Sequence, residues 1–107
     1  MSDDSVYVVY VTAGSMDQAR SLGRRAVEAR LAACCNILPA IESIYEWEGK
    51  VVGETEVAFL LKTTARQLDA LTSQLATWHS YKVPCIVAWP IAQGHAPFVS
   101  WVREQTR

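Results

Sequence analysis

Two long strand-like segments joined by a tight turn constrain the fold of this chain more than any other feature of its sequence. From residue 34 to 48 the pattern has a period of two beyond Pro39, and the return segment covers residues 51–62. The Glu-Gly-Lys sequence at 48–50 predicts the turn between them. Proline cannot donate to a strand ladder, so Pro39 predicts an edge strand or a bulge. Because both arms exceed the usual strand length of about 5 to 6 residues, we expect the hairpin to project beyond the rest of the fold.

The other elements alternate between strand and helix patterns. Residues 5–13 and 84–91 are short, apolar and β-branched, which predicts two further strands. Capping-box pairs at Ser15 with Gln18 and at Thr64 with Gln67 predict the starts of two helices. The expected apolar positions are Ala19, Leu22, Ala26, Val27 and Leu31 in the first helix, Leu68, Leu71, Leu75 and Trp78 in the second, and Phe98, Trp101 and Val102 in a third that begins at Pro97.

The resulting order is β-α-β-β-α-β with an additional C-terminal helix. This order is typical of a ferredoxin-like α+β fold, in which an antiparallel sheet carries its helices on one face. The chain has 107 residues and is 50% hydrophobic, so we expect one domain over residues 1–107. Such a fold serves many functions, and the function has to be argued from sites.

Charge and motif spacing argue against several functions of this fold class. The net charge of -1 provides no attraction to nucleic acid or anionic lipid, and the third strand offers only Phe59 for base stacking. The loop after the first strand lacks a cysteine pair for a soft cation, and three cysteines are too few for an iron-sulfur cluster. No apolar run reaches the ~20 residues of a membrane span, and the acidic N-terminus is unlike a signal peptide. We therefore expect a cytoplasmic protein without a nucleic-acid or membrane partner.

Three segments carry a resemblance that extends from Val6 to Val102. They read ARLAACCNILPAIESIYEWEGK from Ala29, EVAFLLKTT from Glu56 and HSYKVPCIVAWPIAQGHAPFVSWV from His79. In this order and spacing they closely resemble the CutA family, the divalent-cation tolerance proteins. The resemblance implies a ferredoxin-like homotrimer whose long hairpins pair with neighbouring subunits. It also implies a cytoplasmic protein linked to divalent metal, notably copper, with no settled molecular activity.

Two positions depart from the pattern of the family. Relatives often have proline at the position of Ser80 and an acidic residue at the position of Cys85. A thiol in place of a carboxylate favours soft cations, so a cleft-facing Cys85 would shift the preference toward copper or zinc. A core-facing Cys85 would have no such effect.

The projecting hairpin predicts self-association independently of the family. It carries Tyr45, Trp47 and Val51, which would form an aggregation-prone edge unless another chain covered them. Closed symmetry is the common solution for soluble oligomers, although the residues alone do not select three subunits over two.

The candidate metal ligands are His79, Cys35 and Cys85. Imidazole and thiolate both bind copper and zinc, and threefold symmetry would bring copies of one residue together. A solvated loop histidine is the alternative for His79. Adjacent strand residues point to opposite faces, so Cys34 and Cys35 cannot jointly bind one ion. Core packing is the favoured interpretation of each, and a thiol in an inter-subunit cleft is the alternative. No cofactor is obligatory, and a divalent metal such as copper is the candidate ligand.

The candidate cleft residues are Tyr45, Trp47, Glu56, Lys62 and Tyr81. Unpaired charges would be costly under a helix, so Glu56 and Lys62 are expected near strand ends or in an inter-subunit groove. This arrangement gives an alternative function, a trimeric signalling or scaffold protein that receives a small anion or a protein in its clefts. Lys62 could instead pair with a carboxylate of the neighbouring chain.

Catalysis is not expected. A thiol of Cys35 or Cys85 with His79 as its base would supply a nucleophile, yet no motif fixes their approach and no third residue orients the base.

Overall fold

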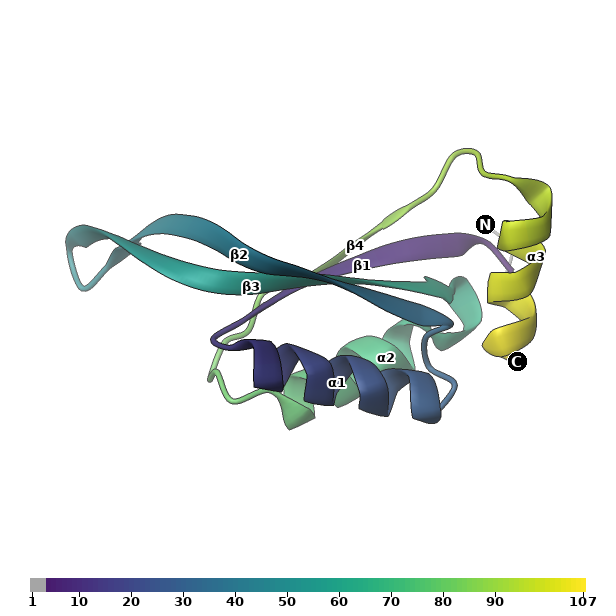
Figure 1. The fold of residues 1–107 in the computed structure, drawn as a ribbon, viewed down its shortest axis with the longest axis horizontal. Helices are drawn as coiled ribbons and strands as arrows, with labels where there is room; N and C mark the ends of the chain where they lie inside the picture. Colours follow the sequence, from purple (N-terminus) through teal and green to yellow (C-terminus); the bar gives the residue numbers. More distant parts are fainter. Residues whose placement is uncertain (1–3) are drawn as a thin grey trace.

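The computed structural model describes residues 4–107. Its elements are β1 (Val6–Ala13), α1 (Met16–Glu28), β2 (Cys34–Trp47), β3 (Lys50–Thr64), α2 (Ala65–Trp78), β4 (Ile86–Pro90) and α3 (Ala96–Gln105). The strands form one antiparallel sheet in the order β2-β3-β1-β4. Helices α1 and α2 cover one face of this sheet, and α3 lies at its end (Figure 1). The predicted α+β fold is confirmed, and the strand bounds agree with the predicted ones to within two residues.

The two predicted helix caps have different outcomes. The Ser15 hydroxyl accepts the Gln18 N–H at 3.1 Å and caps α1 as predicted. The second capping box is wrong, because the Thr64 side chain makes no cap bond to α2. Its hydroxyl lies 3.2 Å from that of Thr106, and the Gln67 amide donates to the Thr106 carbonyl at 3.0 Å. These contacts fasten the end of α3 to the start of α2.

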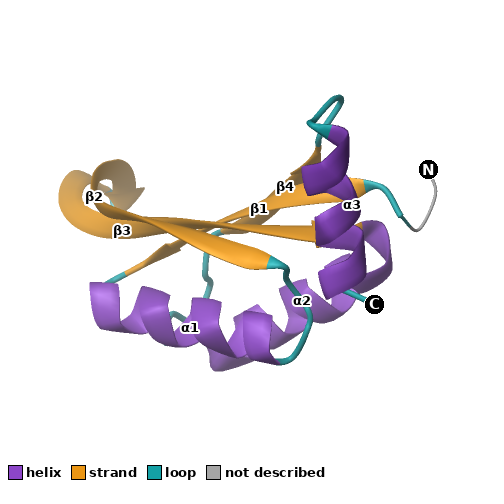
Figure 2. Ribbon diagram, turned by 45° about the vertical axis from the view of Figure 1, so that its right-hand side comes forward, coloured by secondary structure: helices purple, strands orange, loops and turns teal. Residues whose placement is uncertain are grey.

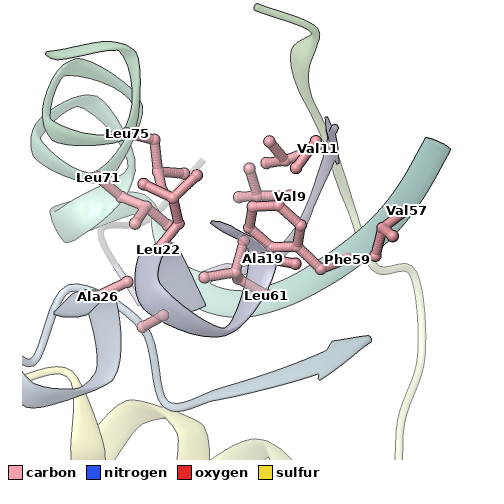
Figure 3. Packing of buried hydrophobic residues seen from close by; sticks show 12 residues of the cluster. Val9, Val11, Ala19, Leu22, Ala26, Val57, Phe59, Leu61, Leu71 and Leu75 are labelled. Atoms are coloured by element: carbon pink, nitrogen blue, oxygen red, sulfur yellow. The ribbon is translucent and has the colours of Figure 1, made fainter. Parts of the chain in front are cut away.

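The core lies between the sheet and helices α1 and α2 (Figure 3). Alternate residues of the central strands face the helices, as the period of two requires. The fully buried side chains of the cluster include Val9, Val11, Phe59 and Leu61 from the strands and Leu71 and Leu75 from α2. Val27, expected on the buried face of α1, is instead 38% exposed.

Helix α3 buries Val102, as the sequence predicted, but leaves the other two predicted residues, Phe98 and Trp101, partly exposed. Val102 is fully buried, with Val99 packed beside it, against Val6 at the start of β1. Phe98 and Trp101 stack on each other at 5.7 Å between ring centroids and are 41% and 39% exposed. The short helix contacts only the end of the sheet, so the largest apolar side chains are left outside. None of the helices within residues 4–107 is long and apolar enough to cross a membrane.

The hairpin of β2 and β3 extends far beyond the helices (Figure 1). Its turn has positive φ at Glu48 and Gly49, and a register shift between Leu38 and Ile41 forms the bulge predicted at Pro39. Strand β1 pairs with β3 only over residues 57–64, so residues 50–56 pair with β2 alone. The projecting part is therefore a two-stranded ribbon, as the strand lengths predicted.

Within residues 4–107, no helix lies across the face of the sheet opposite α1 and α2 (Figure 2). Cross-strand pairs place Tyr10 beside Leu60 and Val87, and Val8 beside Trp89, on this face. Val87 is 52% and Trp89 is 45% exposed. Among the described residues, both the hairpin and one face of the sheet are therefore without an apolar cover.

Candidate functional site

Glu56 and Tyr81 are the centre of a polar cluster at the base of the hairpin. The Tyr81 hydroxyl donates to Glu56 Oε2 at 2.8 Å, and Glu56 is only 7% exposed. The neighbouring Val57 faces the core, so alternation along β3 places the Glu56 carboxylate on the open face of the sheet. Burial, followed by the hydrogen bond with Glu56, raises the pKa of Tyr81 to about 12. Tyr81 is therefore a neutral donor at physiological pH.

A second tyrosine-glutamate pair and a thiol adjoin the first pair. Desolvation and a hydrogen bond with Glu54 raise the pKa of Tyr45. Burial and, to a smaller extent, the Glu56 carboxylate raise the pKa of the Cys85 thiol. The negative charges of both carboxylates raise the pKa of each tyrosine further. We call these five residues the Glu56 cluster: Tyr45, Glu54, Glu56, Tyr81 and Cys85.

His79 is held firmly beneath this cluster. Its Nε2 lies 2.7 Å from the Thr12 carbonyl, and its Nδ1 accepts the Tyr81 N–H at 3.1 Å. The ring is 7% exposed and lies 4.7 Å from the Tyr81 ring. These contacts require the proton on Nε2 and use the lone pair of Nδ1. The alternative of a solvated loop histidine is wrong, and a metal at Nδ1 would have to displace the Tyr81 N–H.

The three thiols lie in separate surroundings. A Cβ added at Gly23 of α1 would lie 2.6 Å from Cys35 Sγ, and Cys35 packs against the core as predicted. Burial is the main cause that raises the pKa of Cys35 to about 11. Cys34 points to the opposite face beside its cross-strand neighbour Lys62, and Cys85 is exposed. Within residues 4–107, no three His, Cys, Asp or Glu side chains form a group suited to hold a metal ion.

The predicted cleft residues lie in three separate places in the chain. Tyr45, Glu56 and Tyr81 meet in the Glu56 cluster. Trp47 lies at the hairpin tip and is 63% exposed, whereas Lys62 lies near the other end of β3 and donates to the Asn36 side-chain oxygen. Lys50 is the cross-strand partner of Trp47, and Lys62 lies twelve positions further along β3. At the usual rise per residue this is a distance of roughly 40 Å along the strand.

Sequence reasoning missed the residues that hold the turn after α2. The Gln18 side-chain amide donates to the Ser80 hydroxyl, so α1 is tied to this turn. A Cβ at Gly14 would lie 3.2 Å from the Tyr81 hydroxyl, which shows how closely the first loop approaches the cluster. The glycine after the first strand was the one available signal for this approach.

Comparisons with known proteins agree with this architecture. A profile of the CutA1 divalent ion tolerance protein family matches residues 7–105. The divalent-cation tolerance protein CutA of Thermus thermophilus is 44% identical over 99 residues, which are 92% of this chain and 96% of that protein. Human protein CutA is 41% identical over 102 residues, which are 95% of this chain and 57% of its own length. The chain therefore spans little more than half of the human relative.

Solved structures show the same fold. The Cut A1 structure from Thermus thermophilus superposes with a TM-score of 0.91 at 43% identity and covers 95% of this chain and 99% of that one. CutA from Xylella fastidiosa superposes with a TM-score of 0.94 at 31% identity and covers 99% and 100% of the two chains. From the matched profile, the sequence identities and the shared fold together, this chain belongs to the CutA1 divalent ion tolerance protein family.

Proposed function

We propose that the chain forms a cytoplasmic homotrimer that binds copper or a similar divalent cation beside its subunit boundaries. Membership of the divalent ion tolerance family supports the link to divalent cations. The main support for the proposal is the location of the Glu56 cluster. Its two carboxylates and one thiol lie at the base of the hairpin, which no other element covers among the described residues.

Self-association is supported by the apolar side chains of the hairpin. Ile44 is 69%, Trp47 is 63% and Val51 is 75% exposed in one subunit. A two-stranded ribbon with such side chains is marginal in water, and β2 is also an edge strand that can accept another chain. A neighbouring subunit would cover the ribbon and bring its own groups to the Glu56 cluster.

Cys85 is the metal ligand that the geometry favours. It is exposed, and Glu56 beside it provides a carboxylate oxygen. Cys35 is packed under α1, and His79 would have to release a hydrogen bond before it could bind an ion. One subunit contributes too few donors for four-coordinate zinc or copper, so the remaining ligands would come from the neighbouring subunit.

Native mass spectrometry and calorimetric titration with Cu(II) test this proposal. We expect a trimer, and a loss of Cu(II) affinity of at least about tenfold in Cys85→Ser but none in the matched Cys34→Ser. Equal Cu(II) affinity in the wild type and in Cys85→Ser would show that Cys85 is not a metal ligand. Equal affinity in the wild type and in His79→Ala would show the same for His79. A stable monomer at dilute concentration would refute the assembly.

The alternative, a trimeric signalling or scaffold protein, draws support from Trp47 and Lys62. Trp47 is exposed at the tip, and the Lys62 ammonium lies on the open face of the sheet. A ligand that binds only the folded state raises the melting temperature by mass action. Melting shifts with small anions, and none with divalent metals, would favour this second function.

A further inference from the structure

A cavity lined by three arginines lies at the α3 end of the molecule and shares no residue with the Glu56 cluster. Its volume of about 430 Å³ is in the range of small-molecule pockets, about 300–1,000 Å³. It forms where the segment before β1, the start of α2 and the end of α3 meet. The lining residues are Asp4, Thr64, Arg66, Arg103, Thr106 and Arg107.

The guanidinium groups outnumber the carboxylates in this cavity. Asp4 Oδ1 lies 3.5 Å from Arg66 Nη2, and the Asp4 backbone carbonyl accepts the Arg103 Nε–H at 2.8 Å. Arg103 therefore donates its Nε–H to an uncharged carbonyl oxygen, and this bond does not neutralise its positive charge. Among residues 4–107, neither Arg103 nor Arg107 has a carboxylate partner. The side chains of the cavity thus carry two positive charges in excess, although the whole chain has a net charge of -1.

Two buried threonines hold the arginine-bearing helices in place. Thr106 donates to the Val102 carbonyl at 2.8 Å, and the Thr64 hydroxyl therefore donates to Thr106 at 3.2 Å. Both threonines are at most 2% exposed. The backbone positions of Arg66 on α2 and Arg103 on α3 are fixed relative to each other by this contact, which lowers the ordering cost of a ligand held between them.

Guanidinium groups recognise phosphate and carboxylate oxygens through paired, charge-assisted hydrogen bonds. We propose that this cavity binds a small phosphate-bearing anion. The first turn of α2 contains no acidic residue, so nothing in that turn offsets the charge of Arg66. The Glu56 cluster contains two carboxylates, opposite in charge to the arginines of the cavity, and would repel such an anion. The two sites share no residue, so the proposed anion site does not depend on the proposed cation site.

Calorimetric titration of the full chain with pyrophosphate tests the proposal. The buffer is metal-free and the ionic strength is held constant, so that neither cation binding nor screening contributes. We expect saturable binding that weakens about tenfold in Arg66→Gln and in Arg103→Gln, since each removes charge-assisted hydrogen bonds. The control is Arg24→Gln, which removes an exposed arginine of α1 outside the cavity and should leave the affinity unchanged.

Three results would overturn the proposal. They are no binding beyond that of chloride at equal ionic strength, wild-type affinity in both cavity variants, or an equal loss in Arg24→Gln, which would indicate a general charge effect. Melting curves without anion show whether each variant is folded. If Arg103→Gln unfolds because it loses the Asp4 contact, Arg66→Gln decides the question alone.

Discussion

The Tyr81 hydroxyl donates to Glu56 Oε2 across 2.8 Å, and this bond joins the turn after α2 to the open face of β3. The same tyrosine gives its backbone N–H to His79, which in turn contacts the carbonyl of Thr12 at the end of β1. Three segments that are distant in sequence therefore meet at the side chains of Tyr81 and His79.

Tyr81→Phe should change how stability depends on alkaline pH. The pKa of Tyr81 is about 12 in the folded chain and about 10 when unfolded, so the folded state holds this proton more tightly. Its contribution is fully present below about pH 10 and is lost as the pH rises through 12. Urea midpoints between pH 8 and pH 11.5 should fall less steeply in Tyr81→Phe than in the wild type. Equal slopes in Tyr81→Phe and in the wild type would contradict the prediction.

His79→Ala should destabilise the fold by about 2–4 kcal/mol, because it removes one buried and one partly buried hydrogen bond and leaves a cavity. Urea denaturation measures the change. His95→Ala is the matched control, since His95 is exposed and makes no side-chain cap bond, and its effect should stay within about 0.5 kcal/mol. Similar effects of the two substitutions would mean that the His79 contacts contribute little.

Gly23→Ala should lower stability even though alanine is the better helix former. The gain in helix propensity is about 1 kcal/mol, and the clash with Cys35 Sγ costs about 1–3 kcal/mol. In a Cys35→Ala background the sulfur is absent, so the same substitution should cost less. A double-mutant cycle should give a coupling of at least about 1 kcal/mol, and additive effects would contradict the contact.

Glu56→Gln should make the Cys85 thiol react faster with iodoacetamide near pH 8. Burial is the main cause of the raised pKa of Cys85, and the Glu56 carboxylate raises it further. A neutral replacement therefore increases the thiolate fraction, while the amide oxygen still accepts the Tyr81 hydroxyl. Peptide mass spectrometry follows each thiol separately. Cys34 in the same variant is the internal control, and an equal acceleration of both thiols would point to general loosening of the fold.

Val51→Lys should weaken assembly by at least about tenfold, because it places a charge among the apolar side chains of the hairpin. Sedimentation velocity over a dilution series measures the effect. Val27→Lys is the control, because Val27 is 38% exposed and lies on α1, outside both the hairpin and the Glu56 cluster. If the two variants assemble equally well, the hairpin is not the contact surface.

The fold could be predicted from the sequence because its signals are local. The turn at Glu48 and Gly49, the bulge at Pro39 and the period of two in both arms each depend on neighbouring residues. The cap at Thr64 could not be predicted, because its hydroxyl bonds to Thr106, 42 residues away. The same limit applies to α3, where the buried side depends on what the end of the sheet offers.

The site was predicted only in part for a similar reason. Tyr45 and Glu56 were both predicted as cleft residues, and the strand register places them on one face of the sheet. The role of His79 depends on two backbone groups, the Thr12 carbonyl and the Tyr81 N–H, which carry no side-chain signal in the sequence. Charge composition likewise gave no hint that Arg66 and Arg103, on different helices, line the same cavity.

Residues 50–56 of β3 have a hydrogen-bonding partner on one side only, and that partner, β2, is itself an edge. A lone ribbon of this kind gains too little from its own contacts to remain ordered in water. Its backbone amides should therefore exchange with deuterium at a rate that falls as the protein is concentrated, whereas the amides of residues 57–64 exchange independently of concentration. Order in the distal arm would then be a property of the assembled particle, acquired only when subunits meet.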